Sequence, residues 1–322
     1  MRLFSYRDRP VHLGPFPLER LPRAEAPPDL SGLAPPAPLS YASDDPASIL
    51  PAMGEYAAML DAIRDGAVKP ERAEIPEDPQ ERAEHLKAFG HYCDASMVGI
   101  CALPDAARLQ TPFVNPGVAT LAEALRTKQT KTLAAGIDVI MAELKEAASR
   151  PLAPLGAHRF ALVFLYEHPR DPVRDEDGCE WILNAQAQRS ALRASETASI
   201  LSVYLRLLGH EARAHTASAS DVDLNALAVA AGLARPGADG RPTTPYVGDR
   251  FALAAVTTTL ELAPDAPLAA ETLAEACDRQ SDFLGHIGGD DFFILFQSPD
   301  WEARIRTAMA QFDASAVGLY TP

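Results

Sequence analysis

Apolar residues follow two different periods along the chain, and together these predict helices that alternate with strands. Three- and four-residue spacing predicts helices over residues 45–66, 78–93, 120–150 and 180–208. Short β-rich runs predict strands over residues 96–103, 159–167, 211–216 and 249–262. Before the last strand, residues 221–234 predict one more helix, which begins at the capping candidate Asp221. Strands separated by helices favour an α/β or α+β fold over a helix bundle or a β-sandwich.

The two ends of the chain differ in texture from this central part. The first fifty residues contain ten prolines, which remove backbone donors and fix φ, so residues 1–44 predict an extended arm over the core, with a disordered tail as the alternative. Near the other end, two apolar runs flank a Gly-Gly-Asp-Asp turn and predict a β-hairpin, and residues 300–314 predict an amphipathic helix. We therefore divide the chain into the arm (1–44), a central domain (45–268) and a C-terminal segment (269–322).

Composition narrows the class of protein. The chain has 29 Lys and Arg against 44 Asp and Glu, a net charge of −15 that repels a phosphate backbone, so we expect no nucleic-acid partner. Its four cysteines form no C-x-x-C pair, which argues against a disulfide framework and against a thiolate-ligated metal site. No apolar run is long enough to cross a bilayer, so we expect no membrane partner either. These features predict a cytoplasmic protein.

Four segments of the central domain occur in an informative order. They are SMVGICAL (96–103), RFALVFLYEHPRDP (159–172), the run from Ile200 to Ala234 and the run from Thr244 to Leu268. In this order they resemble the corrinoid-binding part of reductive dehalogenases, and residues 8–21 resemble the start of the non-exported branch of that family. The resemblance implies a nitroreductase-like fold, with a mixed sheet flanked by helices, that cradles cobalamin, acts on a small organohalide and admits a homodimer.

The chain departs from the family's pattern in two places. Reductive dehalogenases follow the last strand with two cysteine-rich iron–sulfur motifs, and they place a tyrosine proton donor before the run that corresponds to residues 200–209 here. This sequence has neither feature. The resemblance therefore predicts a chain that holds no iron–sulfur cluster of its own and depends on an external electron donor, such as an iron–sulfur protein.

The loop after the third predicted strand is the candidate binding site. Small residues there let a backbone approach a flat ligand while hydroxyl groups offer hydrogen bonds. The predicted cofactor-binding residues are His215, Thr216, Ser218, Ser220 and Asn225. The same letters also suit a plain strand-to-helix turn capped by Asp221, in which His215 is simply a hydrogen-bonded histidine rather than a ligand of a metal or a phosphate. The resemblance also implies that Arg250 is the catalytic residue, the counterpart of the family's basic residue near the substrate, with a surface ion pair as the alternative role.

The C-terminal segment carries a second resemblance. GHIGGDDFFILF followed by DWEAR is similar to the active-site hairpin of diguanylate cyclases, the GGDEF family. The resemblance implies nucleotide binding at Arg279, Asp282, Gly288 and Gly289, and Mg²⁺ at Asp290 and Asp291 if the segment is functional. Because the segment is far shorter than a whole cyclase domain, the alternatives are a degenerate module that binds a cyclic dinucleotide through the R-x-x-D site, and a remnant that binds nothing.

Overall fold

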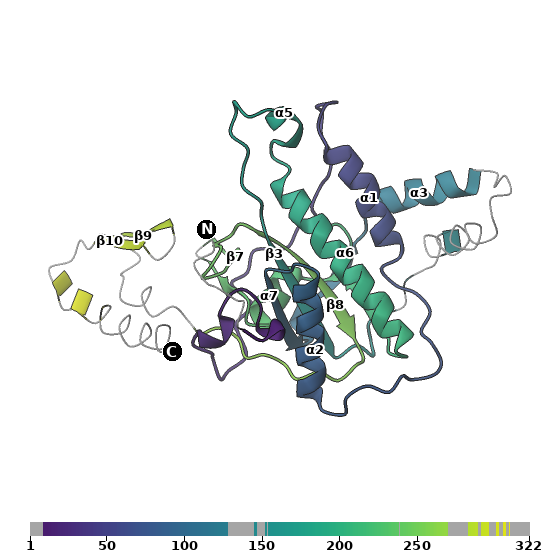
Figure 1. The fold of residues 1–322 in the computed structure, drawn as a ribbon, viewed down its shortest axis with the longest axis horizontal. Coiled ribbons are helices and arrows are strands. Elements are labelled where there is room, and N and C mark those ends of the chain that lie inside the picture. The colour runs from purple at the N-terminus through teal and green to yellow at the C-terminus, as the bar shows by residue number, and fades with distance from the viewer. Residues whose placement is uncertain are drawn as a thin grey trace.

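The computed structural model describes residues 9–127, 154–237 and 239–269, together with short pieces elsewhere (145, 146, 152, 283–288, 291–295, 301, 302, 305, 306 and 309). The helices of the main body are α1 (Leu50–Ala62), α2 (Pro79–Tyr92), α3 (Pro116–Thr127), α5 (Cys179–Ile182), α6 (Gln186–Leu207) and α7 (Leu224–Ala230) (Figure 1). The strands there are β1 (Met97–Ala102), β2 (Arg108–Phe113), β3 (Phe160–Glu167), β4 (Ala212–His215), β5 (Ser220–Val222), β6 (Arg235–Pro236), β7 (Pro242–Thr243) and β8 (Phe251–Thr258). Single 3-10 turns occur at Val11–Leu13, Leu18–Arg20 and Asp105–Ala107.

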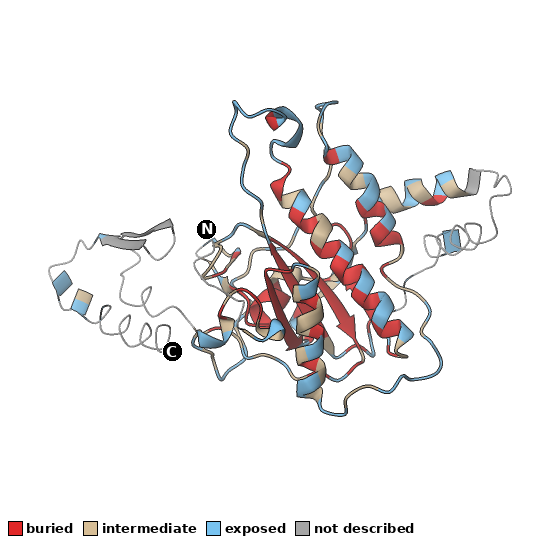
Figure 2. Cartoon of the chain, in the orientation of Figure 1, coloured by how far each residue is buried: buried red, intermediate tan, exposed pale blue. Residues whose placement is uncertain are grey.

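The core is a four-stranded sheet in the order β1-β3-β8-β4. Its strands are apolar at nearly every position because helices cover both faces, and Figure 2 shows them buried along their length. On β3, Val163 and Leu165 face the cluster that contains α7, whereas Leu162 and Phe164 face the cluster that contains α2 and α6. The fold is therefore α+β, as predicted, and every pairing in this sheet is antiparallel where a mixed sheet was expected.

Two helix boundaries differ from the sequence-based expectation. The helix expected over 180–208 is two helices, because the chain turns at Asn184, whose φ is 60°. The helix expected to begin at Asp221 begins at Leu224, and its N-cap is Asp223, whose carboxylate accepts from the backbone N–H groups of Asn225 and Ala226. The prediction that Asp221 is the cap was wrong: Asp221 lies in β5 and pairs with a buried arginine instead.

The proline-rich residues 9–33 are attached firmly to the main body. Phe16 stacks on Tyr246 with ring centroids 5.1 Å apart, and the Tyr246 hydroxyl donates to the carbonyl oxygen of Pro17. The guanidinium group of Arg23 donates to the carbonyl oxygens of Gly232 and Ala266. Apolar side chains of this stretch also pack against the α7 side of the core.

The C-terminal segment contains an antiparallel hairpin of β9 (Phe283–Gly288) and β10 (Asp291–Leu295), in which Gly288 pairs with Asp291. A hairpin at the Gly-Gly-Asp-Asp turn is what the sequence predicted. Arg279, Asp282, Gly289 and Asp290 lie outside the described residues. Within the described part of the chain, no helix combines the length and the apolar character that a membrane crossing requires.

Candidate functional site

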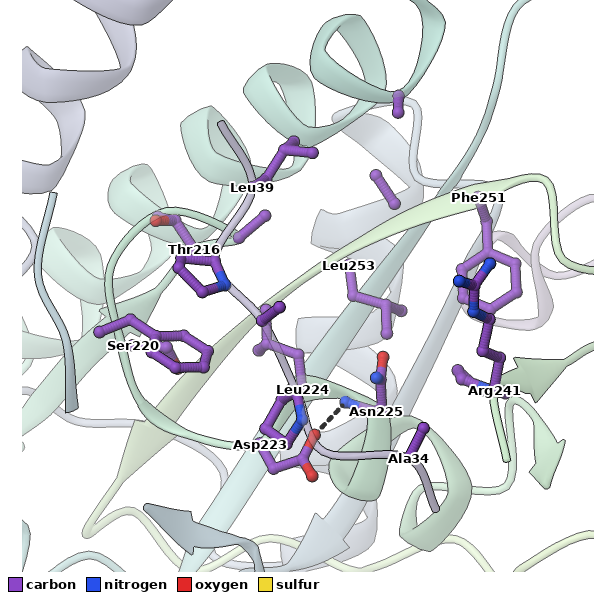
Figure 3. Close-up of a pocket in the computed structure, with 18 of the residues that line it drawn as sticks. Ala34, Leu39, Thr216, Ser220, Asp223, Leu224, Asn225, Arg241, Phe251 and Leu253 are labelled. Carbon is purple, nitrogen blue, oxygen red and sulfur yellow. Dashed lines mark hydrogen bonds between the residues drawn. The ribbon is translucent and has the colours of Figure 1, made fainter. Parts of the chain in front are cut away.

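A cavity of about 590 Å³ lies at the end of the sheet where β8 begins, and Figure 3 shows its lining. Its walls come from segments far apart in the sequence: the arm, the loop between β4 and α7, the start of β8 and the 241–242 turn. The lining contains small side chains, such as Ala187, Ala217 and Ala252, as well as the larger apolar side chains of Phe113 and Leu253. Cavities of this size hold drug-sized ligands, for which about 300–1,000 Å³ is usual.

Residues 34–39 of the arm (Ala-Pro-Pro-Ala-Pro-Leu), here called the strap, form one wall of the cavity. In Figure 3 the backbone from Ala34 to Leu39 crosses the view between the β4–α7 loop and the turn that carries Arg241. The backbone N–H of Ala34 donates to the carbonyl oxygen of Gly240, and that of Leu39 donates to the carbonyl oxygen of Ala217, both at 2.8 Å. The strap is therefore held to the body by a backbone bond at each end.

A buried carboxylate fixes the loop beneath the cavity. Asp61 on α1 is only 5% exposed and accepts hydrogen bonds from the hydroxyl groups of Thr216 and Ser218, each at 2.7 Å. The side-chain amide of Asn115 donates to the same carboxylate at 2.8 Å. Burial raises the pKa of Asp61, and the three donors and the nearby Arg64 counteract this only in part. This cluster ties residues 216–218 to a helix of the main body.

A second polar cluster, made of Arg64, Arg213, Asp65 and Asp221, holds β5 in place. The guanidinium of Arg64, 4% exposed at its side chain, lies 2.7 Å from the carboxylate of Asp221, and that of Arg213 lies 3.4 Å from it. Arg213 also pairs with Asp65 at 2.7 Å. Buried charges are tolerated only when they are paired in this way. The two arginines therefore hold the strand that leads into the cavity lining.

The ring of His215 is completely buried and part of a chain of hydrogen bonds. The backbone N–H of Asp221 donates to Nδ1 of His215, so the ring proton lies on Nε2, which is 2.8 Å from the hydroxyl oxygen of Thr257. The same hydroxyl is 2.7 Å from Nδ1 of His158. Burial lowers the pKa of His215 well below its usual value, and burial, followed by the charge of Arg213, lowers that of His158 to about 4. Both histidines are neutral at pH 7.

The predicted binding residues therefore occupy two different positions. Thr216, Ser220 and Asn225 line the cavity, whereas His215 and Ser218 do not. The hydroxyl groups of Thr216 and Ser220 are engaged with Asp61 and with the backbone of Val222. Figure 3 shows the amide of Asn225 directed into the cavity, between Leu253 and Arg241.

Arg250 lies beside the cavity, between the lining residues Asp249 and Phe251, and is not itself part of the wall. Its guanidinium is 2.9 Å from the carboxylate of Asp171, and its side chain is half exposed. The ion pair that was the alternative role for this arginine is therefore present.

Several lining residues were not predicted. They are chiefly the strap, Phe113, His168, Arg241 and Leu253. His168 is the first residue after β3, a position from which side chains commonly reach a site at the end of a sheet. Burial, followed by the charge of Arg250, lowers the pKa of its ring, and Nε2 is buried without a hydrogen-bond partner among the described residues. The signal for His168 was present in the sequence as the polar residue that ends an apolar strand.

Beside the charged side chains of Asp223, Asp249 and Arg241, the lining offers neutral polar groups. Asn225 offers both a donor and an acceptor, and Nε2 of the His168 imidazole has no hydrogen-bond partner among the described residues. Among the described residues, no group of three or more His, Cys, Asp or Glu side chains is arranged to hold a metal ion.

Comparison with solved structures identifies proteins with a similar fold. The catabolic reductive dehalogenase NpRdhA superposes on this chain with a TM-score of 0.62 and 37% sequence identity over 84% of the chain. Its complex with 3-bromo-4-hydroxybenzoic acid matches with the same values. A structure described as suggesting a mechanism for B12-dependent dehalogenation matches with a TM-score of 0.60 and the same identity. The chain resembles a reductive dehalogenase.

The match concerns part of a longer protein, because the chain spans 32% of the length of these reductive dehalogenases. No family model matches the chain, and no curated protein matches it. The resemblance to reductive dehalogenases that the sequence suggested is supported by these structural neighbours.

Proposed function

We propose that the cavity binds a corrinoid and that the chain takes part in the reduction of carbon–halogen bonds with electrons from an external donor. The observation that carries the proposal is a cavity lined by small residues and backbone. It lies in a chain whose sequence is 37% identical, over 84% of its length, to a reductive dehalogenase described as suggesting a mechanism for B12-dependent dehalogenation. B12-dependent dehalogenation and the complex with a brominated benzoic acid are findings about those relatives. Their extension to this chain rests on the chemistry of the lining.

That chemistry fits a flat macrocycle fringed with amides. Small side chains along the cavity let such a disc approach the backbone, and Phe113 and Leu253 offer apolar contact. The amide of Asn225 can both donate to and accept from an amide of the ligand. Burial, followed by the charge of Arg250, lowers the pKa of His168, which favours a neutral ring that adds a polar contact without a buried charge.

Reduction of an organohalide to the parent compound and halide consumes two electrons and one proton. A bound corrinoid would supply the cobalt centre at which this reduction takes place. Residues 1–322 contain four cysteines without a C-x-x-C pair, so the proposed electron donor is an iron–sulfur group that lies outside these residues. Arg250 is the proposed polar anchor for the organohalide, because it adjoins the cavity residue Phe251 and its side chain is half exposed.

A spectrum tests cofactor binding directly. The full chain is mixed with hydroxocobalamin, desalted and scanned in the visible range. We expect the corrin bands to elute with the protein in a stoichiometric amount. Elution of a colourless protein under conditions where its thermal unfolding is normal would refute corrinoid binding.

A second candidate function is recognition of a cyclic guanine dinucleotide by the C-terminal segment. The antiparallel pairing of β9 and β10 across the Gly-Gly-Asp-Asp turn supports it, since this is the hairpin that the GGDEF resemblance implies. Arg279 and Asp282 would hold the dinucleotide, and Asp290 and Asp291 would hold Mg²⁺. Calorimetry of the full chain against cyclic di-GMP, with Arg279→Ala as the control, tests it: equal isotherms for the two proteins would remove the site.

A further inference from the structure

We infer that the strap, residues 34–39, is a displaceable cover that sets which ligands enter the cavity: small ligands fit beneath it, and a corrinoid enters only when it swings away. The inference rests on the proposed function and deepens it. A corrinoid with its peripheral side chains is larger than the drug-sized ligands for which about 590 Å³ is ample. The strap forms one wall of the cavity, so its displacement would enlarge the space available to the macrocycle.

The contacts of the strap are few compared with those of the arm that precedes it. Three of its six residues are prolines, so only Ala34, Ala37 and Leu39 carry a backbone N–H. The bonds to Gly240 and Ala217 hold its two ends, and the side-chain amide of Gln188 donates to the carbonyl oxygen of Ser40 just beyond it. Pro35, Ala37 and Pro38 are exposed to solvent.

Anchors on either side define where the strap can pivot. On the N-terminal side, Leu30 and Leu33 pack against the core. On the C-terminal side, Ala217 belongs to the loop that Asp61 fixes through Thr216 and Ser218. A short, weakly held span between two firm anchors can open without unfolding the body.

Gly240 is the position at which the strap can be released selectively. A Cβ atom placed on Gly240 would lie 2.8 Å from the backbone nitrogen of Ala34 and 2.9 Å from the carbonyl oxygen of Gly32, both in the arm. The φ angle of Gly240 is +78°, so Gly240→Ala also introduces backbone strain. Gly248 provides the matched control, because its φ is +61° and a Cβ there would meet no atom within 4 Å.

The test compares the wild-type chain, Gly240→Ala and Gly248→Ala in binding to hydroxocobalamin and to cobinamide. The apparent affinity equals the intrinsic affinity multiplied by the open fraction, and a lost hydrogen bond changes that fraction about fivefold. We therefore expect Gly240→Ala to bind both corrinoids about fivefold more tightly than Gly248→Ala. Gln188→Ala, which removes the bond to Ser40 from a helix surface, should act in the same direction if Gly240→Ala fails to fold.

Hydrogen exchange gives a readout that does not depend on affinity. Ligands usually protect the amides that they cover, whereas a displaced strap exposes its own. We expect the peptide containing Ala34, Ala37 and Leu39 to exchange faster when a corrinoid is bound. Slower exchange there, with equal affinities for the two glycine variants, would show that the strap is a fixed part of the binding wall and would overturn the inference while leaving corrinoid binding intact. Failure of all variants to retain a corrinoid, even where exchange shows the strap released, would overturn the proposed function together with the inference.

Discussion

The polar groups that support the cavity and those at its rim, by which we mean Asn225 and His168 of the lining, differ in whether their hydrogen bonds are already made within the protein. Beneath the cavity, the side chains of Asp61, Thr216 and His215 bond to other protein groups at 2.7–2.8 Å. At the rim, the amide of Asn225 is directed into the cavity, and Nε2 of His168 has no partner among the described residues. Residues that are fully engaged inside the protein hold the site in shape, whereas unengaged ones are free to recognise a ligand. The comparison therefore divides the site into a supporting layer and a binding layer.

The sharpest way to break the supporting layer is to remove the buried carboxylate. Asp61→Ala leaves the donors of Thr216, Ser218 and Asn115 without their acceptor in a dry environment. We expect the free energy of unfolding to fall by about 3 kcal/mol or more, measured by urea denaturation. Asp61→Asn keeps one acceptor oxygen at the same place and should cost less. Equal losses in the two variants would show that the hydrogen bonds are not what stabilises this loop.

Lowering the pH should give the next largest loss of stability, again through the supporting layer. The folded-state pKa values of His158 and His215 lie below their unfolded value of about 6.5. At a pH between the folded and the unfolded pKa of each ring, unfolding therefore takes up protons. Stability is fully present above pH 6.5 and falls as the pH drops toward 4, by at most about 1.4 kcal/mol per pH unit for each histidine. The pKa of Asp61 is raised, so protonation of its carboxylate opposes this loss at the acid end.

Urea denaturation at pH 7, 6 and 5 measures the effect, and the control is His85→Gln, because His85 is largely exposed at its side chain. The control should leave the slope against pH unchanged. A flat profile for the wild-type chain would contradict the assignment of neutral, buried histidines.

The sequence predicted the elements of the fold better than the division of the site. Apolar runs placed three strands of the central sheet, because strands buried between helices are mostly apolar. The fourth strand, β4, was predicted although its buried positions include Arg213 and His215. The sequence predicted the small-residue loop at the cavity, yet it could not separate Thr216, whose hydroxyl supports the loop, from Asn225, whose amide is directed into the cavity. That distinction depends on Asp61 and Asn115, which lie about a hundred or more positions earlier in the chain. The strap was likewise visible only as proline content, since its position over the cavity depends on long-range pairing with Gly240 and Ala217.

A change in the binding layer should have the opposite signature from one in the supporting layer. Asn225→Ala removes an amide that is directed into the cavity, so we expect affinity for hydroxocobalamin to fall about five- to tenfold while stability changes by no more than about 0.5 kcal/mol. Thr216→Val is the companion variant: it should lower stability by about 1–2 kcal/mol through the lost bond to Asp61. Titration of corrin absorbance and urea denaturation measure the two quantities. Variants that change affinity and stability in the same proportion would remove the distinction between the layers.

The smallest expected effect on stability is at Arg250, beside the rim. Its ion pair with Asp171 is half exposed, so Arg250→Ala should change the free energy of unfolding by no more than about 1 kcal/mol and should not affect retention of a corrinoid. Asp171→Ala breaks the same ion pair but keeps the guanidinium. If Arg250 anchors the organohalide, only Arg250→Ala raises KM in a dehalogenation assay supplied with a chemical reductant, and Asp171→Ala leaves it unchanged or lowers it, since the guanidinium is freed for the substrate. An equal rise in KM for both variants would assign the effect to the ion pair, and Arg250 would then belong with the supporting residues.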